Sequence, residues 1–221
     1  MNYLTHKLLN SEELEILRKN LAKDSLEWED GKLTAGKHAA KGKNNLQLRR
    51  DSDLSIKFSG LITKKILSNE LIKSFALPKK IHGTIFSKST SGMKYGRHID
   101  NAYMSSGRAD LSFTVFLNCK KKYEGGALSI QGLNSEEKFK LDAGEIIIYP
   151  STYLHSVEKV IDGERLVFIG WIESYVKSIE EREYLFDLDA AARSLLAKYG
   201  RSEEVDLIYK SYSNFLRRLG N

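Results

Sequence analysis

The chain has 221 residues, of which 41% are hydrophobic and 29% charged, a composition typical of a folded globular protein and not of a disordered one. Its one cysteine, Cys119, excludes an intramolecular disulfide framework and a cysteine-based zinc site. The longest strongly apolar run, residues 166–172, is too short to cross a bilayer, and the first ten residues do not have the pattern of a signal peptide. We therefore expect a cytoplasmic protein with no membrane partner.

The net charge of +6 is confined to one part of the chain. Residues 1–80 carry 16 basic and 10 acidic side chains, whereas residues 81–175 carry 11 of each and residues 176–221 carry 8 of each. Two interpretations stay open: a solvated basic surface, or a rim that steers an anionic substrate or cosubstrate towards a site. Much of the excess comes from Lys32, Lys37, Lys41, Lys43, Arg49 and Arg50.

Helices are expected in the first third of the chain. Asn10 can cap a helix that runs to about residue 23, with leucines at helical spacing. A second helix is predicted to begin at Asp51 or Ser52 and to continue through Ile66, and a short helical segment follows through Phe75. Residues 27–49 are expected to be irregular or to form short strands.

From residue 81 the pattern changes to short segments rich in β-branched and aromatic residues, separated by turn signals. Such spacing favours an antiparallel sandwich or barrel. After residue 175 two helical stripes follow. The predicted fold class is α+β with a mainly β core, divided into an N-terminal helical or irregular part (1–80), the core (81–175) and a C-terminal helical extension (176–221). The expected strands are 81–88, 110–118, 126–132, 137–141, 145–150, 154–160 and 165–173.

A candidate metal site comes from two histidines and an aspartate. His98 and Asp100 are two residues apart, so in an extended segment they point to the same side, and His155 lies on a later strand. Two imidazoles and one carboxylate form the facial triad that leaves open positions on a non-haem Fe(II) ion. The His-x-Asp spacing alone is a weak signal, since roughly 0.25 matches are expected by chance, and a loop hydrogen bond or an ordinary strand histidine would also explain it.

Arg165 strengthens this interpretation. A hairpin turn at Asp162-Gly163 would return the chain beside His155 and place the guanidinium deeper in the core. An arginine at the start of so apolar a strand is costly to bury unless an anion accompanies it, and its planar fork suits a carboxylate.

At this point the sequence resembles the iron(II)- and 2-oxoglutarate-dependent oxygenases, and within them the PKHD-type hydroxylases, relatives of prolyl and lysyl hydroxylases. The resemblance covers nearly the whole chain and rests on segments 43–48, 95–101, 108–114, 123–128, 149–165 and 185–189. It implies a double-stranded β-helix (jelly-roll) core. It also implies iron on His98, Asp100 and His155, the distal carboxylate of 2-oxoglutarate on Arg165, and ascorbate as reductant. Two positions depart from the pattern: Ser89 replaces a frequent aromatic, and Ala127 replaces the glutamate of a Gly-Gly-Glu-Leu turn.

Further residues are candidates for roles around this site. Tyr95, Ser112 and Thr114 can hydrogen-bond 2-oxoglutarate or be ordinary core residues, and Asn101 and Asp110 are candidates for orienting the histidines. Lys43, Asn45 and Gln47 alternate on an apparently extended segment, so all three can face the pocket, where amides suit a polar substrate. The alternative for this segment is a polar edge strand. Asp110 is also a candidate substrate residue.

Three functions are compatible with these patterns. The first is a dioxygenase that hydroxylates a C–H bond of a peptidyl, amino-acid or small-metabolite substrate with O2, decarboxylating 2-oxoglutarate to succinate. The second is a nucleic-acid demethylase of the same chemistry; Trp171 stands where such enzymes carry a second arginine, which argues against nucleic acid as a partner. The third is a non-catalytic, metal-binding cupin-like domain. The C-terminal helices are expected to be a structural cap or a homodimer interface.

Overall fold

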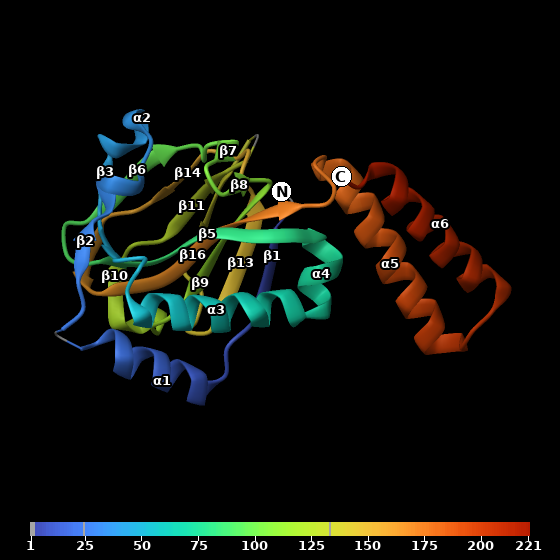
Figure 1. The fold of residues 1–221 in the computed structure, drawn as a ribbon, viewed down its shortest axis with the longest axis horizontal. Coiled ribbons are helices and arrows are strands. Elements are labelled where there is room, and N and C mark those ends of the chain that lie inside the picture. The colour runs from blue at the N-terminus through green and yellow to red at the C-terminus, as the bar shows by residue number, and fades with distance from the viewer. Residues whose placement is uncertain (1–2, 24, 133) are drawn as a thin grey trace.

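Two antiparallel sheets form the body of the protein in a computed structural model that describes residues 3–23, 25–132 and 134–221 (Figure 1). The seven-stranded sheet has the order β1 (Leu4–Lys7), β13 (Glu145–Pro150), β9 (Leu111–Phe116), β16 (Arg165–Ser174), β5 (Pro78–Ser89), β4 (Leu46–Leu48) and β2 (Trp28–Asp30). The five-stranded sheet has the order β12 (Glu136–Phe139), β11 (Leu128–Gln131), β14 (His155–Val157), β6 (Lys94–His98) and β3 (Lys43–Asn44). Two small pairs complete the strands: β10 (Tyr123–Gly125) with β15 (Val160–Gly163), and β7 (Tyr103–Met104) with β8 (Gly107–Arg108).

The sheets recruit strands from the first 80 residues, which the sequence pattern had suggested only in part. β1 pairs with β13, β3 with β6, and β4 with β5, so both sheets contain N-terminal strands. Between β2 and β3 the chain forms a 3-10 helix, η1 (Gly31–Thr34), and a short helix, α2 (Lys37–Ala40). The N-terminal segment is therefore part of the β architecture and not only a helical support for it.

Strand β13 shows how the layers are packed. All its residues after Glu145 are buried, because Ile146 and Ile148 join one hydrophobic cluster while Ile147 and Tyr149 join another. The first cluster lies between the seven-stranded sheet and the N-terminal helices, and the second contains Leu128, Ile130 and Phe139 of the five-stranded sheet. Side chains alternate along a strand, so an uninterrupted apolar run indicates a strand covered on both faces.

Helices α1 (Ser11–Leu21) and α3 (Asp53–Ser68) cover the outer face of the seven-stranded sheet, below it in Figure 1. The predicted start of α1 is confirmed, since Asn10 and Glu13 form a reciprocal capping box that satisfies two backbone N–H groups. Ser52 caps α3 by accepting from the N–H of Ser55. Helix α4 (Glu70–Ala76) follows, and Leu77 ends it in the left-handed conformation.

The C-terminal helices α5 (Ile179–Tyr199) and α6 (Glu203–Leu219) pack against each other beyond one end of the sheets (Figure 1). A short 3-10 turn, η2 (Lys120–Lys122), lies within the core segment. Among the described residues, no helix is both long and apolar enough to span a membrane.

A buried polar contact attaches α5 to α4 and yields a first prediction. Asp189 is only 7% exposed; its carboxylate accepts from the Ser74 hydroxyl (2.6 Å) and lies 2.9 Å from Arg193 Nε. We expect Asp189→Ala to lower the free energy of unfolding by about 1–3 kcal/mol, because the buried Ser74 hydroxyl loses its acceptor. Chemical denaturation measures this, with exposed Asp187→Ala as the matched control, for which about 0.5 kcal/mol or less is expected. Equal effects of the two substitutions would contradict the prediction.

Candidate active site

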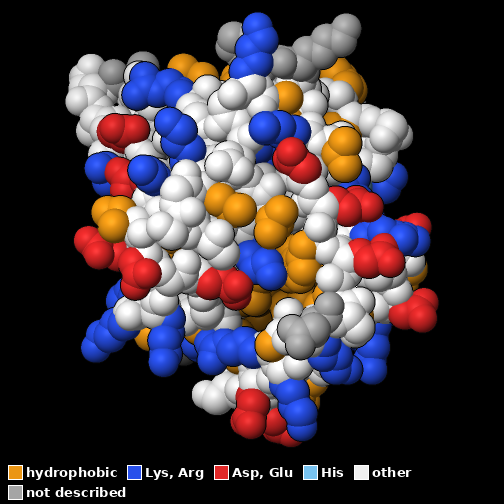
Figure 2. Space-filling view, turned by 90° about the vertical axis from the view of Figure 1, so that its left-hand side faces the viewer, with side chains coloured by type: hydrophobic (Ala, Val, Ile, Leu, Met, Phe, Trp, Pro, Cys, Tyr) orange, Lys and Arg blue, Asp and Glu red, His pale blue; other side chains and the backbone are white. Residues whose placement is uncertain are grey.

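A cavity of about 680 Å³ is lined by residues of both large sheets and of the segment from η1 to β4. Figure 2 shows the end of the molecule that carries β2, β3 and α2: hydrophobic side chains gather near its centre, and both signs of charge surround them. All three residues of the predicted metal site and Arg165 line this cavity. A cavity of this size with a few converging polar groups is typical of a small-molecule site.

The triad is assembled by a strand pairing. His98 ends β6 and His155 begins β14, and the two residues are register partners in the five-stranded sheet. Asp100 follows β6 by two residues; its Oδ1 lies 3.9 Å from His98 Nε2, and its Oδ2 lies 3.7 Å from His155 Nε2. One ligand atom from each residue lies within 4.8 Å of the others, so the three could hold a metal ion. The described part of the chain contains no other group of this kind.

Both imidazoles are oriented by backbone carbonyls. His98 Nδ1 lies 2.8 Å from the Gly96 oxygen, and His155 Nδ1 lies 3.0 Å from the Tyr153 oxygen. A carbonyl only accepts, so each Nδ1 carries the proton and each Nε2 keeps a free lone pair directed at the shared space. Burial and the neighbouring His155 lower the pKa of His98 to about 4, which keeps it neutral, as a metal ligand must be. The expectation that Asn101 and Asp110 orient the rings is wrong, because these carbonyls do so.

Asp100 is held by a hydroxyl. Ser112 Oγ on β9 donates to Asp100 Oδ2 at 2.6 Å and lies 2.7 Å from Ser151 Oγ. The sequence suggests Ser112 as a hydrogen-bond donor to 2-oxoglutarate, whereas in the structure its closest acceptor is this carboxylate. Ser112 thus fixes the orientation of the only carboxylate among the described residues that line the cavity.

This contact gives a second prediction. In Ser112→Ala the Asp100 carboxylate loses its 2.6 Å donor, and we expect affinity for a divalent metal to fall by about 10–100-fold, the range seen for residues that support metal ligands. Calorimetric titration with Ni(II) or Co(II) measures the change. Ser156→Ala is the control, since Ser156 lies on β14 beside His155 and does not line the cavity; unchanged affinity in Ser112→Ala would contradict the assigned role.

Arg165 lies across the cavity, on a different sheet from the one expected. The predicted hairpin between His155 and Arg165 is wrong: β14 pairs with β6 and β11, while β16 pairs with β5 and β9. Arg165 is 3% exposed, has no ion-pair partner among the described residues, and its Nε has no hydrogen-bond partner there. Burial lowers its pKa. A buried guanidinium without a counter-ion points to an anion that binds beside it.

Of the two departures from the family pattern, one lies beside Arg165 and the other follows a glycine that packs on it. Ser89 is its register partner on β5, and Ala127 follows Gly126. Gly126 has φ +65°, and a side-chain carbon there would lie 3.2 Å from Arg165 Cδ. The Gly125-Gly126 turn therefore leaves the room that the arginine stem occupies.

The predicted substrate segment does face the cavity. Lys43, Asn45 and Gln47 are all at most 8% exposed and line it together. Asn45 Nδ2 donates to Ser87 Oγ (2.6 Å), and the Thr34 hydroxyl lies between Gln47 Oε1 (2.7 Å) and Lys43 Nζ (3.2 Å).

Two of the predicted cosubstrate residues also line the cavity. Tyr95 stacks on His98 with ring centroids 3.7 Å apart, and burial together with Asp100 raises the pKa of Tyr95 to about 12. Thr114 faces the same space from β9.

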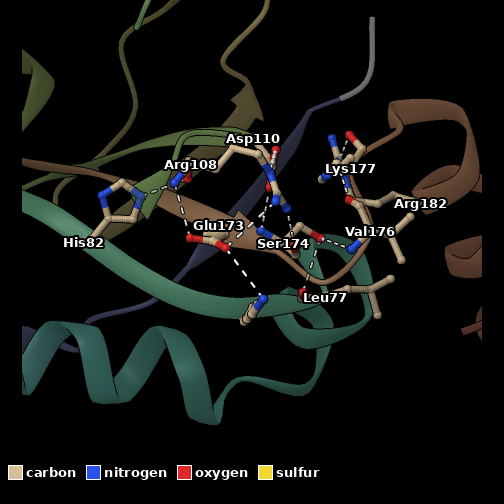
Figure 3. A network of polar contacts seen from close by, with 10 residues as sticks. Leu77, His82, Arg108, Asp110, Glu173, Ser174, Val176, Lys177 and Arg182 are labelled. Carbon is tan, nitrogen blue, oxygen red and sulfur yellow. Dashed lines mark hydrogen bonds and ion pairs between the residues drawn. The ribbon is translucent and has the colours of Figure 1, made fainter. Parts of the chain in front are cut away.

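Asp110 is placed elsewhere. Its carboxylate accepts from Arg108 Nε (2.7 Å) and from the backbone N–H of Ser174 (2.8 Å), within the polar network of Figure 3. It is not among the residues that line the cavity, so the prediction that it contacts substrate has no geometric support. The network instead connects β8 and β9 to the end of β16, where Arg108 also lies near Glu173.

Thr34, Tyr149 and Trp171 line the cavity but were not expected there from the sequence, and Arg50 was named only as part of the basic excess. Trp171 could have been found, since residues 165, 167, 169 and 171 of β16 all line the cavity at a spacing of two. Of the six basic residues named for the charge excess in residues 1–80, only Lys43 and Arg50 line the cavity among those described. Arg49 pairs with Glu27 and Asp51, and the side chain of Lys37 lies outside the described residues.

Comparison with known proteins defines the class. A family model described as the 2OG-Fe(II) oxygenase superfamily matches residues 84–173, and a model of the PKHD-type hydroxylase C-terminal domain matches residues 180–220. The first match contains the three predicted metal ligands and Arg165.

Individual relatives narrow this class to a family. Two PKHD-type hydroxylases of Prochlorococcus marinus, from strains MIT 9215 and MIT 9515, are 74% and 70% identical over 220 and 221 residues, covering 100% of both chains. The chain belongs to the PKHD-type hydroxylases, within the 2OG-Fe(II) oxygenases, and is thus assigned to a family of oxidoreductases that implies Fe(II) and 2-oxoglutarate.

Solved structures share the fold at low sequence identity. A prolyl-4-hydroxylase from Pseudomonas putida has a TM-score of 0.55 and 16% identity, covering 78% of this chain and 92% of its own. HygX from Streptomyces hygroscopicus, solved with nickel, 2-oxoglutarate and hygromycin B, has a TM-score of 0.55 and 12% identity, covering 80% and 84%.

Proposed function

We propose that the protein is an Fe(II)- and 2-oxoglutarate-dependent dioxygenase that hydroxylates a C–H bond of a peptidyl, amino-acid or small-metabolite substrate and releases succinate and CO2. One observation carries this proposal: two free imidazole nitrogens and a carboxylate converge in the same cavity as a buried arginine without a described counter-ion. The triad suits Fe(II), and the arginine suits a carboxylate.

The two sheets support a more specific architecture. β6, β14 and β11 are neighbours in one sheet, and β13, β9, β16 and β5 are neighbours in the other. Apart from the β11–β12 pair, the strands of these two sheets alternate between them from β5 to β16. We infer a double-stranded β-helix, or jelly roll, with the cavity between the sheets. In such an arrangement the metal ligands come from one sheet and its following loop, and the arginine comes from the other.

In this proposal His98, Asp100 and His155 hold the iron, and Arg165 binds the distal carboxylate of 2-oxoglutarate. Iron with 2-oxoglutarate and O2 supplies the oxidising power for attack on an unactivated C–H bond. The protein's own contribution is positional: the Gly96 and Tyr153 carbonyls hold the histidine tautomers, and Ser112 holds Asp100. Tyr149, which is buried and packs edge-on to His155, helps to keep water away from the ligands.

The test is a measurement of 2-oxoglutarate turnover. Purified protein with Fe(II), ascorbate and O2 is expected to convert 2-oxoglutarate to succinate slowly alone and faster with substrate. A library of metabolites and peptides is screened for products heavier by 16 mass units, the gain of one oxygen atom. Tight metal binding without any 2-oxoglutarate turnover would instead indicate the cupin-like, non-catalytic alternative. Ascorbate as the reductant, a cytoplasmic location and a homodimer stay predictions.

A further inference from the structure

The cavity carries more positive charge than metal and cosubstrate binding use. The described residues that line it include three basic side chains, Lys43, Arg50 and Arg165, and a single carboxylate, Asp100. None of the three basic groups forms an ion pair with a described carboxylate. Unpaired charge around a partly enclosed cavity attracts and retains ions of the opposite sign.

The excess can be assigned to particular residues, provided that the proposed function is correct. A divalent metal and Arg165 bring three positive charges, which Asp100 and the two carboxylates of 2-oxoglutarate match. Lys43 and Arg50 are then left without a partner. The loaded site therefore still has positive charge for a further anionic group.

Lys43 is built into the wall of the cavity. It is 5% exposed, its Nζ lies 3.2 Å from Thr34 Oγ1, and it lies 4.9 Å from the centroid of the Tyr95 ring that stacks on His98. Burial and the nearby Arg50 lower its pKa to about 8. An ammonium group is rarely buried without an anionic partner, and Thr34 satisfies only one of its three N–H donors.

Neighbouring groups extend this position towards solvent. Gln47, four residues further on in β4 of the seven-stranded sheet, is buried, and its Nε2 has no hydrogen-bond partner among the described residues. It lies near Lys43 because the Thr34 hydroxyl contacts both Gln47 Oε1 and Lys43 Nζ. Arg50 lines the same cavity and is exposed. Three exposed apolar side chains, Leu33 (74%), Ile99 (53%) and Tyr103 (74%), also line it. Hydrogen-bond donors inside the cavity and apolar side chains at its opening suit a ligand with an anionic end and an apolar body.

We propose that Lys43, assisted by Gln47 and Arg50, binds a carboxylate of the primary substrate, so that the enzyme selects carboxylate-bearing molecules with an apolar portion. This assignment rests on the proposed function and names the substrate class of the same site. Lys43 lies on the wall that holds Tyr95 and His98, whereas Arg165 lies on the opposite sheet. Substrate and cosubstrate carboxylates are thereby received at different positions.

The test compares two probes that differ in a single charge, N-acetyl-L-leucine and N-acetyl-L-leucinamide. Binding is measured by NMR saturation transfer and by calorimetry on full-length protein loaded with Zn(II), which supports no turnover, and saturated with 2-oxoglutarate. We expect the acid to bind at least about tenfold more tightly than the amide. In Lys43→Met the preference is expected to fall below about twofold, with Arg50→Met between the two because its charge is exposed.

Lys94→Met is the matched control. Lys94 is adjacent to Tyr95 on β6, is exposed, and does not line the cavity, so removal of its charge is expected to leave the preference unchanged. Equal binding of acid and amide to wild-type protein, or an unchanged preference in Lys43→Met, would overturn the assignment. So would a Lys43→Met variant that loses only 2-oxoglutarate affinity, because Lys43 would then serve the cosubstrate. Failure of the wild-type protein to bind 2-oxoglutarate would overturn the proposed function as well, which distinguishes the two failures.

Discussion

Asp100→Asn is expected to lower affinity for divalent metal by more than about 100-fold and to reduce 2-oxoglutarate turnover to background, since groups that merely support a ligand already contribute 10–100-fold. Asparagine has nearly the same shape and can still accept from Ser112, so the change isolates the charge. Without this charge, only two neutral imidazoles would hold the metal. The site would then lose most of its electrostatic attraction for a divalent ion, which would stay hydrated in solution. Calorimetric metal titration and succinate release measure the two effects.

The fold is expected to survive this substitution. The Asp100 side chain is only 9% exposed and forms no ion pair with a lysine or arginine among the described residues, so its charge stabilises the metal-free protein little. The melting temperature of metal-free Asp100→Asn should therefore match or exceed that of the wild type. Asp162→Asn removes the same charge from an exposed position on strand β15 and should change neither measurement. Metal affinity that stays unchanged in Asp100→Asn would exclude the triad as the metal site.

The metal site was accessible from the sequence because the geometry of two of its three residues is local. A spacing of two places His98 and Asp100 on one side, and the strand pattern around His155 places it in the core. The position of Arg165 could be predicted only in part from the sequence. The sequence Asp162-Gly163 suggests a hairpin turn, but both residues belong to strand β15, which pairs with β10 and not with β16. Choice of sheet partner depends on contacts far away in sequence, which no turn signal specifies.

Other features that the sequence did not predict have a related cause. Strand β6 has no apolar alternation, because its inward residues, Tyr95 and His98, serve the cavity and not the hydrophobic core. Local patterns are expected to fail at functional sites for this reason. Strand β1 is only four residues long and exists through its pairing with β13. The carbonyls of Gly96 and Tyr153, which orient the histidines, carry no side-chain signal at all.

Arg165→Met is expected to keep or raise the stability of the ligand-free protein and to abolish its stabilisation by 2-oxoglutarate. In the absence of ligand, Arg165 is a buried charge without a counter-ion among the described residues, so an apolar side chain of similar length should leave stability unchanged or raise it by about 1–4 kcal/mol. With 2-oxoglutarate bound, the wild type should instead be more stable than Arg165→Met. At 100 times its Kd, a ligand that binds only the folded state stabilises the wild type by about 2.7 kcal/mol; the variant should gain almost nothing.

Chemical denaturation of the metal-loaded proteins, with and without 2-oxoglutarate, measures both halves of this prediction. Arg165→Lys keeps the charge but not the planar fork, so its response to 2-oxoglutarate should lie between those of the wild type and Arg165→Met. Arg97→Met is the control, because Arg97 is exposed and forms only a loose ion pair with Glu136 (3.9 Å). If Arg165→Met destabilised the ligand-free protein and kept the stabilisation by 2-oxoglutarate, the arginine would be a structural residue, and the cosubstrate carboxylate would bind elsewhere. A stabilised variant that no longer responds to 2-oxoglutarate would show that the buried charge is maintained for the ligand and at the expense of the fold.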